Sequence, residues 1–156
     1  MFAGALVPSY AQGSATFSKG DFKTLIVEKF VVGPKTDMST DRLNVLMLEI
    51  ADELFKIKKF NEIVEPRAPR QAAPPTGAAV LHLSGTVSGY YSLLPEDNTI
   101  TTLYGRLKVT LQFRDDSGKL LMESDIGKHV IYPLSFGDTT RKVAKEVAHI
   151  TKKTFF

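Results

Sequence analysis

Three histidines are the side chains of this sequence that could bind a metal or transfer a proton near neutral pH. His82, His129 and His149 are far apart in the chain, and none has another ligand residue at the spacing of a metal site. His82 and His149 are therefore predicted to be solvated or hydrogen-bonded side chains without a catalytic role. We expect no metal site and no cofactor.

Two pairs of neighbouring carboxylates, Glu96 with Asp97 and Asp115 with Asp116, could in principle act as a general acid and a general base. Both pairs occur in predicted turns, where an Asp side chain accepts hydrogen bonds from the nearby backbone. The sequence contains no cysteine, no Gly-x-Ser-x-Gly elbow and no glycine-rich phosphate loop. Because no residue stands out as a nucleophile, we predict that the chain is not an enzyme and has no catalytic residues.

Composition indicates a single globular domain. The chain has 156 residues, of which 43% are hydrophobic, and a formal net charge of +3. We see no block of like charge, and few basic residues accompany the aromatic ones, so nucleic acid is not an expected partner. No apolar run reaches the roughly 18 residues that a membrane-spanning helix needs, so no transmembrane segment is expected.

Residues 1–12 differ in composition from the rest of the chain. A short apolar stretch from Phe2 to Pro8 is followed by Ser9 and Ala11, small residues at the two positions that a signal peptidase reads. Two interpretations are open: the remnant of a signal peptide whose basic start is missing, or a disordered tail. The first implies an exported protein whose mature chain begins near Gln12.

Residues 78–132 have the alternation of an antiparallel meander of three strands. Odd positions of the first run are apolar and even positions are mostly polar, which places Tyr90 with the polar set. The second run, 103–113, alternates in the same way, and the Asp-Asp-Ser-Gly-Lys sequence at 115–119 is typical of a tight turn. The third run has apolar residues on one parity with two polar interruptions: Leu120, Met122, Ile126 and Val130, interrupted by Ser124 and Lys128.

The remaining elements are predicted to flank or cover this meander. A strand over 23–32 is apolar on both parities and therefore buried within the sheet, and a short strand over 60–64 is expected at or near its edge. A second helix is expected to begin at Asp138 as its N-cap and to end near residue 154. Before it, an amphipathic helix capped by Ser39 or Thr40 has one apolar stripe: Leu43, Leu46, Met47, Ile50, Ala51, Leu54 and Phe55.

The predicted fold class is α+β. We expect a two-layer sandwich in the order β-α-β-β-β-β-α, with about five mostly antiparallel strands and both helices on one face. The domain covers 22–156 and follows a flexible lead-in at 13–21. A proline- and alanine-rich stretch at 66–77 is predicted to be an extended loop.

The polar face of the meander has two interpretations. It could bind a small ligand or a glycan, or it could be an ordinary solvated sheet face in which neighbouring side chains pair with one another. We favour the second interpretation. The residues on this face are Ser84, Thr86, Ser88, Arg106, Lys108, Thr110 and Gln112.

Large apolar residues at margins of the fold are the better candidates for contact with a partner. Leu93 and Leu94 begin a long hairpin loop, Phe155 and Phe156 close the sequence, and Phe60 and Ile63 belong to the predicted edge strand. Exposed apolar groups at such places often mark partner contacts, although those of the loop and the last two residues could equally fold back onto the domain. Edge strands also accept added strands from other chains.

Several short motifs resemble those of DUF4410, a family of bacterial envelope proteins without an assigned activity. The resemblance covers about residues 22–154, and the motifs are structural rather than catalytic. The architecture is also similar to the amino-terminal domain of the Tol–Pal translocation protein and to the periplasmic domain of the curli secretion channel. The motifs are Leu25-Ile26-Val27-Glu28-Lys29-Phe30, Gly33-Pro34, Lys59-Phe60-x-x-Ile63-Val64, Leu83-x-Gly85-x-Val87-x-x-Tyr90, Phe113-Arg114-Asp115 and Gly118-Lys119-Leu120-Leu121.

The resemblance implies an exported protein of a Gram-negative bacterium, periplasmic or associated with the outer membrane. This sequence lacks the anchoring cysteine of lipoprotein relatives. We therefore expect a non-enzymatic module that binds a protein partner in an envelope assembly. The alternative is a domain that binds a small ligand or a glycan on the polar face, and the oligomeric state stays open.

Overall fold

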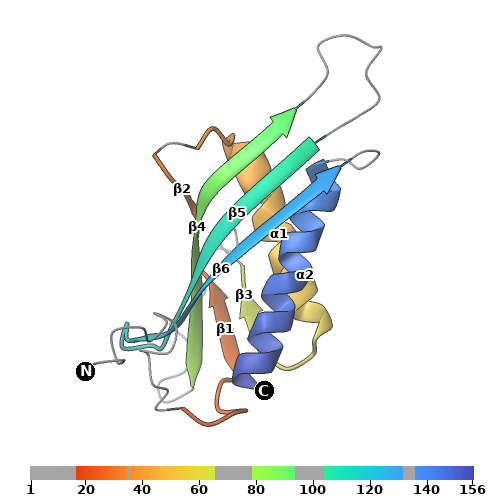
Figure 1. The fold of residues 1–156 in the computed structure, drawn as a ribbon. Helices are drawn as coiled ribbons and strands as arrows, with labels where there is room; N and C mark the ends of the chain where they lie inside the picture. The colour runs from red at the N-terminus through yellow and green to blue at the C-terminus, as the bar shows by residue number, and fades with distance from the viewer. Residues whose placement is uncertain (1–16, 35, 66–78, 94–103, 132–135) are drawn as a thin grey trace, which may run out of the picture.

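The computed structural model describes residues 17–34, 36–65, 79–93, 104–131 and 136–156 (Figure 1). The predictions for residues 1–12, for the loop at 66–77 and for Leu94 lie outside these residues. Leu93 is described as the last residue of a strand, without its side chain. The predicted turn that holds Glu96 and Asp97 and the first part of the lead-in, residues 13–16, also lie outside the described residues.

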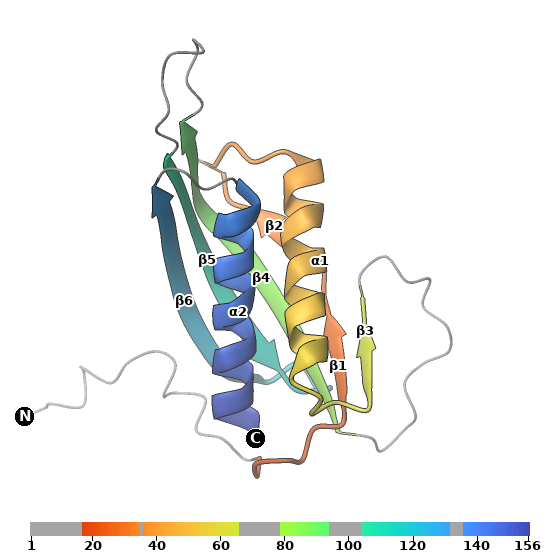
Figure 2. The ribbon, with the colours of Figure 1, turned by 90° about the vertical axis from the view of Figure 1, so that its right-hand side faces the viewer.

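The described residues form one sheet and two helices. The sheet has the strand order β3-β1-β4-β5-β6, and β2 pairs with β4. Figure 2 shows the two helices side by side over one face of the sheet, which confirms the predicted two-layer α+β class. The elements are β1 (Thr24–Val27), β2 (Val31–Val32), α1 (Thr40–Lys56), β3 (Glu62–Val64), β4 (Val80–Leu93), β5 (Tyr104–Arg114), β6 (Leu120–Ile131) and α2 (Phe136–Phe155).

The sheet is mixed. The predicted meander is confirmed, because β4, β5 and β6 pair antiparallel in sequence order. The other three pairings, β1 with β3, β1 with β4 and β2 with β4, are parallel. The expectation of mostly antiparallel strands thus applies to the meander alone. The physical reason is that α1 carries the chain back to the end where β1 began, so that β3 starts beside β1 and runs in the same direction.

The strand predicted over residues 23–32 is divided in two. All four residues of β1 are buried, as expected for a strand between two neighbours. The ladder stops after Val27 and resumes at β2, and between them Phe30 is fully buried in the core. Its ring lies against Gly85 of β4, where a Cβ atom would be only 2.4 Å from the Cε2 atom of Phe30. The strand is therefore divided at the point where the ring of Phe30 packs against Gly85.

A β-bulge in β4 reverses the alternation of its side chains. The pairing of β4 with β5 shifts between Val87 and Gly89, so Tyr90 lies opposite the buried Leu107. Tyr90 consequently packs against the core, and its assignment to the polar parity was wrong. One extra residue in a strand moves every later side chain to the other face. Tyr90 also accepts a hydrogen bond from Arg42 of α1.

Both helices present a buried stripe to the sheet. Ser39 caps α1 as predicted, accepting a hydrogen bond from the backbone of Arg42 at 3.3 Å. α2 begins at Phe136, two residues before the expected cap Asp138, which therefore lies inside the helix. The buried residues are Leu43, Leu46, Met47, Ile50, Ala51 and Leu54 on α1, and, among the described side chains of α2, Thr139, Thr140, Val143, Ala144, Val147, Ala148, Thr151 and Phe155.

A cluster of phenylalanine rings closes the core at the C-terminal end of α2. Phe155 is fully buried, and its ring centroid lies 4.9 Å from that of Phe17, 5.5 Å from Phe22 and 5.1 Å from Phe113. The backbone N–H of Gly20 donates to the carbonyl of Phe155 at 2.7 Å. Phe155 is thus a core residue and is not available as a partner contact. Of the predicted lead-in, residues 17–21 belong to the described part and lie against the end of α2.

The turn between β5 and β6 is built around Asp115, as the sequence predicted. Its Oδ1 atom accepts hydrogen bonds from the backbone of Ser117 at 2.9 Å, the hydroxyl of Ser117 at 2.5 Å and the backbone of Lys119 at 3.0 Å. Gly118 adopts a φ of 89°, which glycine reaches without steric cost. The pKa of Asp115 is lowered from its ordinary value of 3.8, mainly by the hydrogen bond that the Ser117 hydroxyl donates. The backbone hydrogen bonds from Ser117 and Lys119 lower this pKa further, whereas burial of the carboxylate raises it and so opposes them.

We expect Asp115→Ala to lower the free energy of unfolding by about 1 kcal/mol at pH 7, the usual loss for a capping carboxylate. Because the pKa of Asp115 is lower in the folded than in the unfolded chain, its contribution is complete above the unfolded pKa. The contribution is lost as pH falls through the folded pKa. Urea unfolding at pH 7 and in acid should therefore give a difference from the parent that shrinks with acidity. Asp37→Ala, at an exposed position, is the control. An equal loss at both pH values would contradict the role of the charged form.

Candidate interaction surface

The outward side of α1 and the adjoining edge strand form what we call the α1–β3 surface, made of Val45, Leu48, Phe55, Phe60 and Ile63. Val45 is 41% exposed, Leu48 40% and Phe55 68%. Their spacing of three and seven residues places them in one line along the helix, away from the stripe that faces the sheet. α1 is therefore apolar on a second side that no described part of the chain covers.

A cavity joins the helix to the edge strand. It has a volume of about 210 Å³ and is lined by Leu54, Phe55, Lys58, Phe60, Asn61 and Ile63. The turn after α1 makes this possible, because Lys58 adopts a φ of 53° and the chain reverses toward β3. A second shallow cavity of about 300 Å³ lies further up α1, beside Val45 and Leu48. The two cavities share no lining residue, and apolar residues of the α1–β3 surface line each of them.

β3 supplies a free sheet edge to this surface. Among the described strands it pairs with β1 alone, through Thr24 opposite Glu62 and Leu25 opposite Ile63. Phe60 and Ile63 are half-buried, and the ring of Phe60 packs edge-on against that of Phe156 at 5.1 Å. No described strand pairs with the outer side of β3, and the backbone groups of such an edge can pair with a further strand.

Charged side chains of α1 lie beside and between the apolar residues of the α1–β3 surface. Lys56 forms ion pairs with Asp52 at 3.0 Å and with Glu53 at 2.9 Å, and the hydrogen bond that Lys56 donates to Glu53 is the main reason that the pKa of Lys56 is raised. Exposed pairs of this kind add little stability. Glu49 and Asp52 line the upper cavity, whereas Lys58 lines the lower one. The surface therefore combines apolar and charged side chains, with Asp52 between Leu48 and Phe55 along α1.

The residues that the sequence predicted as partner contacts differ in their location and burial in the structure. It brings Phe60 and Ile63 together at the sheet edge, with Phe156 half-buried behind Phe60, and it buries Phe155. The sequence interpretation missed Val45 and Leu48 and assigned Phe55 to the core stripe, although Phe55 is mostly exposed. The available signal was spacing, because positions 45, 48 and 55 lie outside the period of the buried residues.

The polar face of the meander is occupied by pairs between its own side chains. Thr110 donates to Asp125 and Gln112 to Glu123, both at 2.7 Å. His82 lies with Nδ1 2.9 Å from Glu28 and Nε2 3.2 Å from Asp116, so it is a hydrogen-bonded residue, as predicted. These pairs are what an ordinary solvated sheet face contains. They favour that interpretation over a site for a small ligand or a glycan.

Two further features bear on the class of function. In the described part of the chain, no three His, Asp or Glu side chains come together as a metal site would require. Neither helix of the same part is both long and apolar enough to cross a membrane.

Comparison with known proteins identifies the fold but no family. No family model matches the chain, and no curated protein matches it. The resemblance to DUF4410 is therefore not confirmed, and no similarity to the Tol–Pal or curli proteins is shown among the structures compared below. The findings come instead from solved structures.

Three of the similar solved structures come from Gram-negative bacteria. A PelC dodecamer from Paraburkholderia phytofirmans is 16% identical, with 88% of this chain and 91% of that chain covered and a TM-score of 0.58. A DUF330 protein from Xanthomonas campestris is 8% identical, with 87% of each chain covered and a TM-score of 0.61. A minor lipoprotein from Acinetobacter baumannii is 14% identical, with 85% of this chain and 94% of that chain covered and a TM-score of 0.51. At these identities the chain shares a fold with a PelC protein, a DUF330 protein and a minor lipoprotein, and these structures indicate no enzyme family.

Proposed function

We propose that this chain is a non-enzymatic protein of the Gram-negative cell envelope, periplasmic or associated with the outer membrane, that binds a protein partner through the α1–β3 surface. The observation that carries the proposal is Phe55, 68% exposed beside a cavity that opens onto the sheet edge. The fold shared with an envelope lipoprotein supports the location.

The chemistry of the α1–β3 surface suits a protein rather than a small molecule. Burying apolar area contributes about 25 cal/mol per Å², so Val45, Leu48 and Phe55 gain by contact with another apolar surface. Exposed apolar side chains with charged neighbours are typical of protein-binding patches. A partner strand added to β3 would supply backbone hydrogen bonds as well.

A second copy of the chain is the partner to test first. The similar PelC structure is a dodecamer, which supports self-association as a proposal for this chain. The alternative partner is a different envelope protein. Both use the same surface, so a single set of variants tests both.

The test places a photo-crosslinking amino acid at position 55 in the chain expressed in the envelope of a Gram-negative host. We expect crosslinks to one partner, identified by mass spectrometry as this chain or as another envelope protein. The matched control is position 31, because Val31 is 56% exposed but lies on β2, outside the α1–β3 surface. Crosslinks of equal yield from both positions, or none from position 55, would contradict the proposal.

A substitution test measures how much Phe55 contributes to the affinity of the association. Phe55→Asp should weaken the association at least tenfold in sedimentation-velocity or pull-down titrations, because a carboxylate would be placed in an apolar contact. Val31→Asp should leave the association unchanged. The melting temperature of both variants should remain near that of the parent, since both side chains are exposed.

A further inference from the structure

The solvent-facing side of α2 is basic over most of its length. We call Lys142, Lys145, His149, Lys152 and Lys153 the basic face of α2; all five side chains are exposed. Their steps of three, four, three and one residues place them on one side of the helix. The one carboxylate among the described side chains of α2, Glu146, lies 3.7 Å from Lys128 of β6 and is thus already paired.

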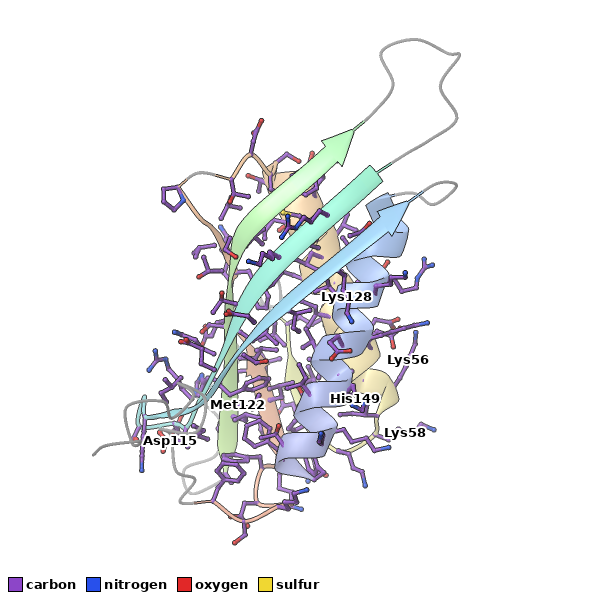
Figure 3. The ribbon with its side chains drawn as sticks, in the orientation of Figure 1. Lys56, Lys58, Asp115, Met122, Lys128 and His149 are labelled. Atoms are coloured by element: carbon purple, nitrogen blue, oxygen red, sulfur yellow. The ribbon has the colours of Figure 1, made fainter. Side chains whose placement is uncertain are left out.

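The basic face continues past the end of the helix. Lys152, Lys153 and His149 line a cavity of about 380 Å³ together with Lys19, Lys59 and Phe156. Figure 3 shows His149 in the lower half of α2, at the same end of the molecule as Lys56 and Lys58 at the end of α1. Lys56 is paired with Asp52 and Glu53, so the positive charge that accumulates along α2 is extended at this end by Lys19, Lys58 and Lys59 (Figure 1).

Compensation of the helix dipole explains only part of this pattern. Cations are favourable in the last turn of a helix, and Lys19 in addition donates to the backbone carbonyl of Lys153 at 3.0 Å. Lys142 and Lys145 lie in the first half of α2, which spans residues 136–155, where the dipole does not favour a cation. No carboxylate of the described residues lies within ion-pair distance of either lysine.

We propose that the basic face of α2 docks on a membrane surface that contains anionic phospholipids. The basic face extends from Lys142 to Lys153, or roughly 16 Å at 1.5 Å per residue, which is longer than one phosphate group and suits a surface that presents many. It offers lysines, which bind phosphates as point charges, and no exposed large apolar residue of the described part lies on α2. The contact is therefore electrostatic, with the helix lying on the headgroups.

The basic face of α2 and the α1–β3 surface belong to different helices, so the docking proposal does not depend on the protein partner. Each lysine near an anionic surface contributes about fivefold to vesicle binding at low salt. Three lysines together should contribute on the order of 100-fold. The effect should fall steeply as salt screens the charges.

The test is co-sedimentation of the purified chain with vesicles. We expect binding to vesicles of phosphatidylglycerol and phosphatidylcholine in about 50 mM salt, no binding to vesicles of phosphatidylcholine alone, and loss of binding in about 500 mM salt. The triple variant Lys145→Gln, Lys152→Gln, Lys153→Gln should bind on the order of 100-fold more weakly. The single variant Lys145→Gln should bind about fivefold more weakly, and it serves if the triple variant does not fold.

A control variant with the same net charge as the α2 triple variant shows whether binding depends on the basic face of α2 or only on the net charge of the protein. Arg106→Gln, Lys108→Gln, Lys119→Gln removes three exposed cations from β5 and the adjoining turn, and it should retain binding within about fivefold of the parent. Phe55→Asp should bind vesicles as the parent does, which separates this proposal from the proposed function. Equal losses in the two triple variants, or no binding of the parent to anionic vesicles, would overturn the docking proposal.

The same set of variants also tests two other anionic ligands, inorganic phosphate and an acidic polypeptide. A rise in melting temperature with inorganic phosphate alone, lost on Lys152→Gln, would indicate a small-anion site in the cavity and would overturn docking on a surface. Binding of an acidic polypeptide such as polyglutamate in preference to anionic vesicles would likewise overturn it.

Discussion

Replacing Gly85 with alanine is expected to lower the free energy of unfolding by about 3 kcal/mol, at the upper end of the cost of overpacking a core. A Cβ atom at this position would lie 2.4 Å from Cε2 of Phe30 and 2.7 Å from two further ring atoms. Phe30 is fully buried, so its ring cannot move aside without displacing other core side chains. Equilibrium unfolding in urea measures the loss directly.

Two further variants identify the cause of that loss. Gly127→Ala, on β6, is the control, because a Cβ there would make only an ordinary contact, at 3.5 Å from Lys108, and should change stability by less than about 0.5 kcal/mol. Gly85→Ala introduced into a Phe30→Leu background should cost at least about 1 kcal/mol less than in the parent. If the two substitutions were additive, the contact between ring and methyl group would not be the source of the destabilisation.

Phe155→Ala should cost about 4 kcal/mol, the usual loss for a buried phenylalanine. The ring of Phe155 joins those of Phe17, Phe22 and Phe113, so its removal leaves a cavity between the end of α2 and the sheet. Residues 17–21 would also lose support, because the ring of Phe17 packs against that of Phe155. The variant should unfold at a markedly lower urea concentration than the parent.

Phe55 provides a matched phenylalanine with the opposite exposure. Phe55→Ala should change the free energy of unfolding by less than about 0.5 kcal/mol, because the ring is 68% exposed. A large loss on Phe55→Ala and a small one on Phe155→Ala would reverse the assignment of core and surface made here. The same pair of variants shows that the sequence position of a phenylalanine at a helix end does not determine its burial.

The predictions that succeeded rest on local patterns. The meander was predictable because alternation along β5 directly reports one buried and one exposed face, and Leu107, Val109, Leu111 and Phe113 are all buried. Ser39 was predictable as a cap because its hydroxyl can satisfy an N–H group that a helix leaves open. The edge strand was predictable from a short β-prone segment ahead of a proline.

The predictions that failed depend on contacts between distant segments. Ser88 looks like any other polar residue in an alternating strand, yet the bulge beside it moves Tyr90 to the core face. The parallel pairing of β1 with β4 has no local signature, because strand order is set by how α1 returns the chain. Phe55 and Phe155 are both apolar residues in the last turn of a helix, and only the packing of neighbouring elements distinguishes them.

The candidate surfaces were predictable in the same uneven way. Phe60 and Ile63 were recognised through the edge strand, whereas Val45 and Leu48 were hidden within a helix already accounted for by its core stripe. The basic face of α2 escaped notice because a net charge of +3 averages over the whole chain and the lysines are not consecutive. A helical projection of residues 141–153 would have shown them on one side.

The central position of β1 has a consequence for the order in which the chain folds. Thr24 pairs with both Glu62 and Val80, so each neighbour of β1 is synthesised after it. The meander closes through hairpins between consecutive strands, and such pairings carry a small loop-closure cost. β1 instead has both of its neighbours only after β4 has been synthesised, although all four of its residues are buried in the folded chain. A chain ending after β3 would leave β1 with a single three-residue neighbour.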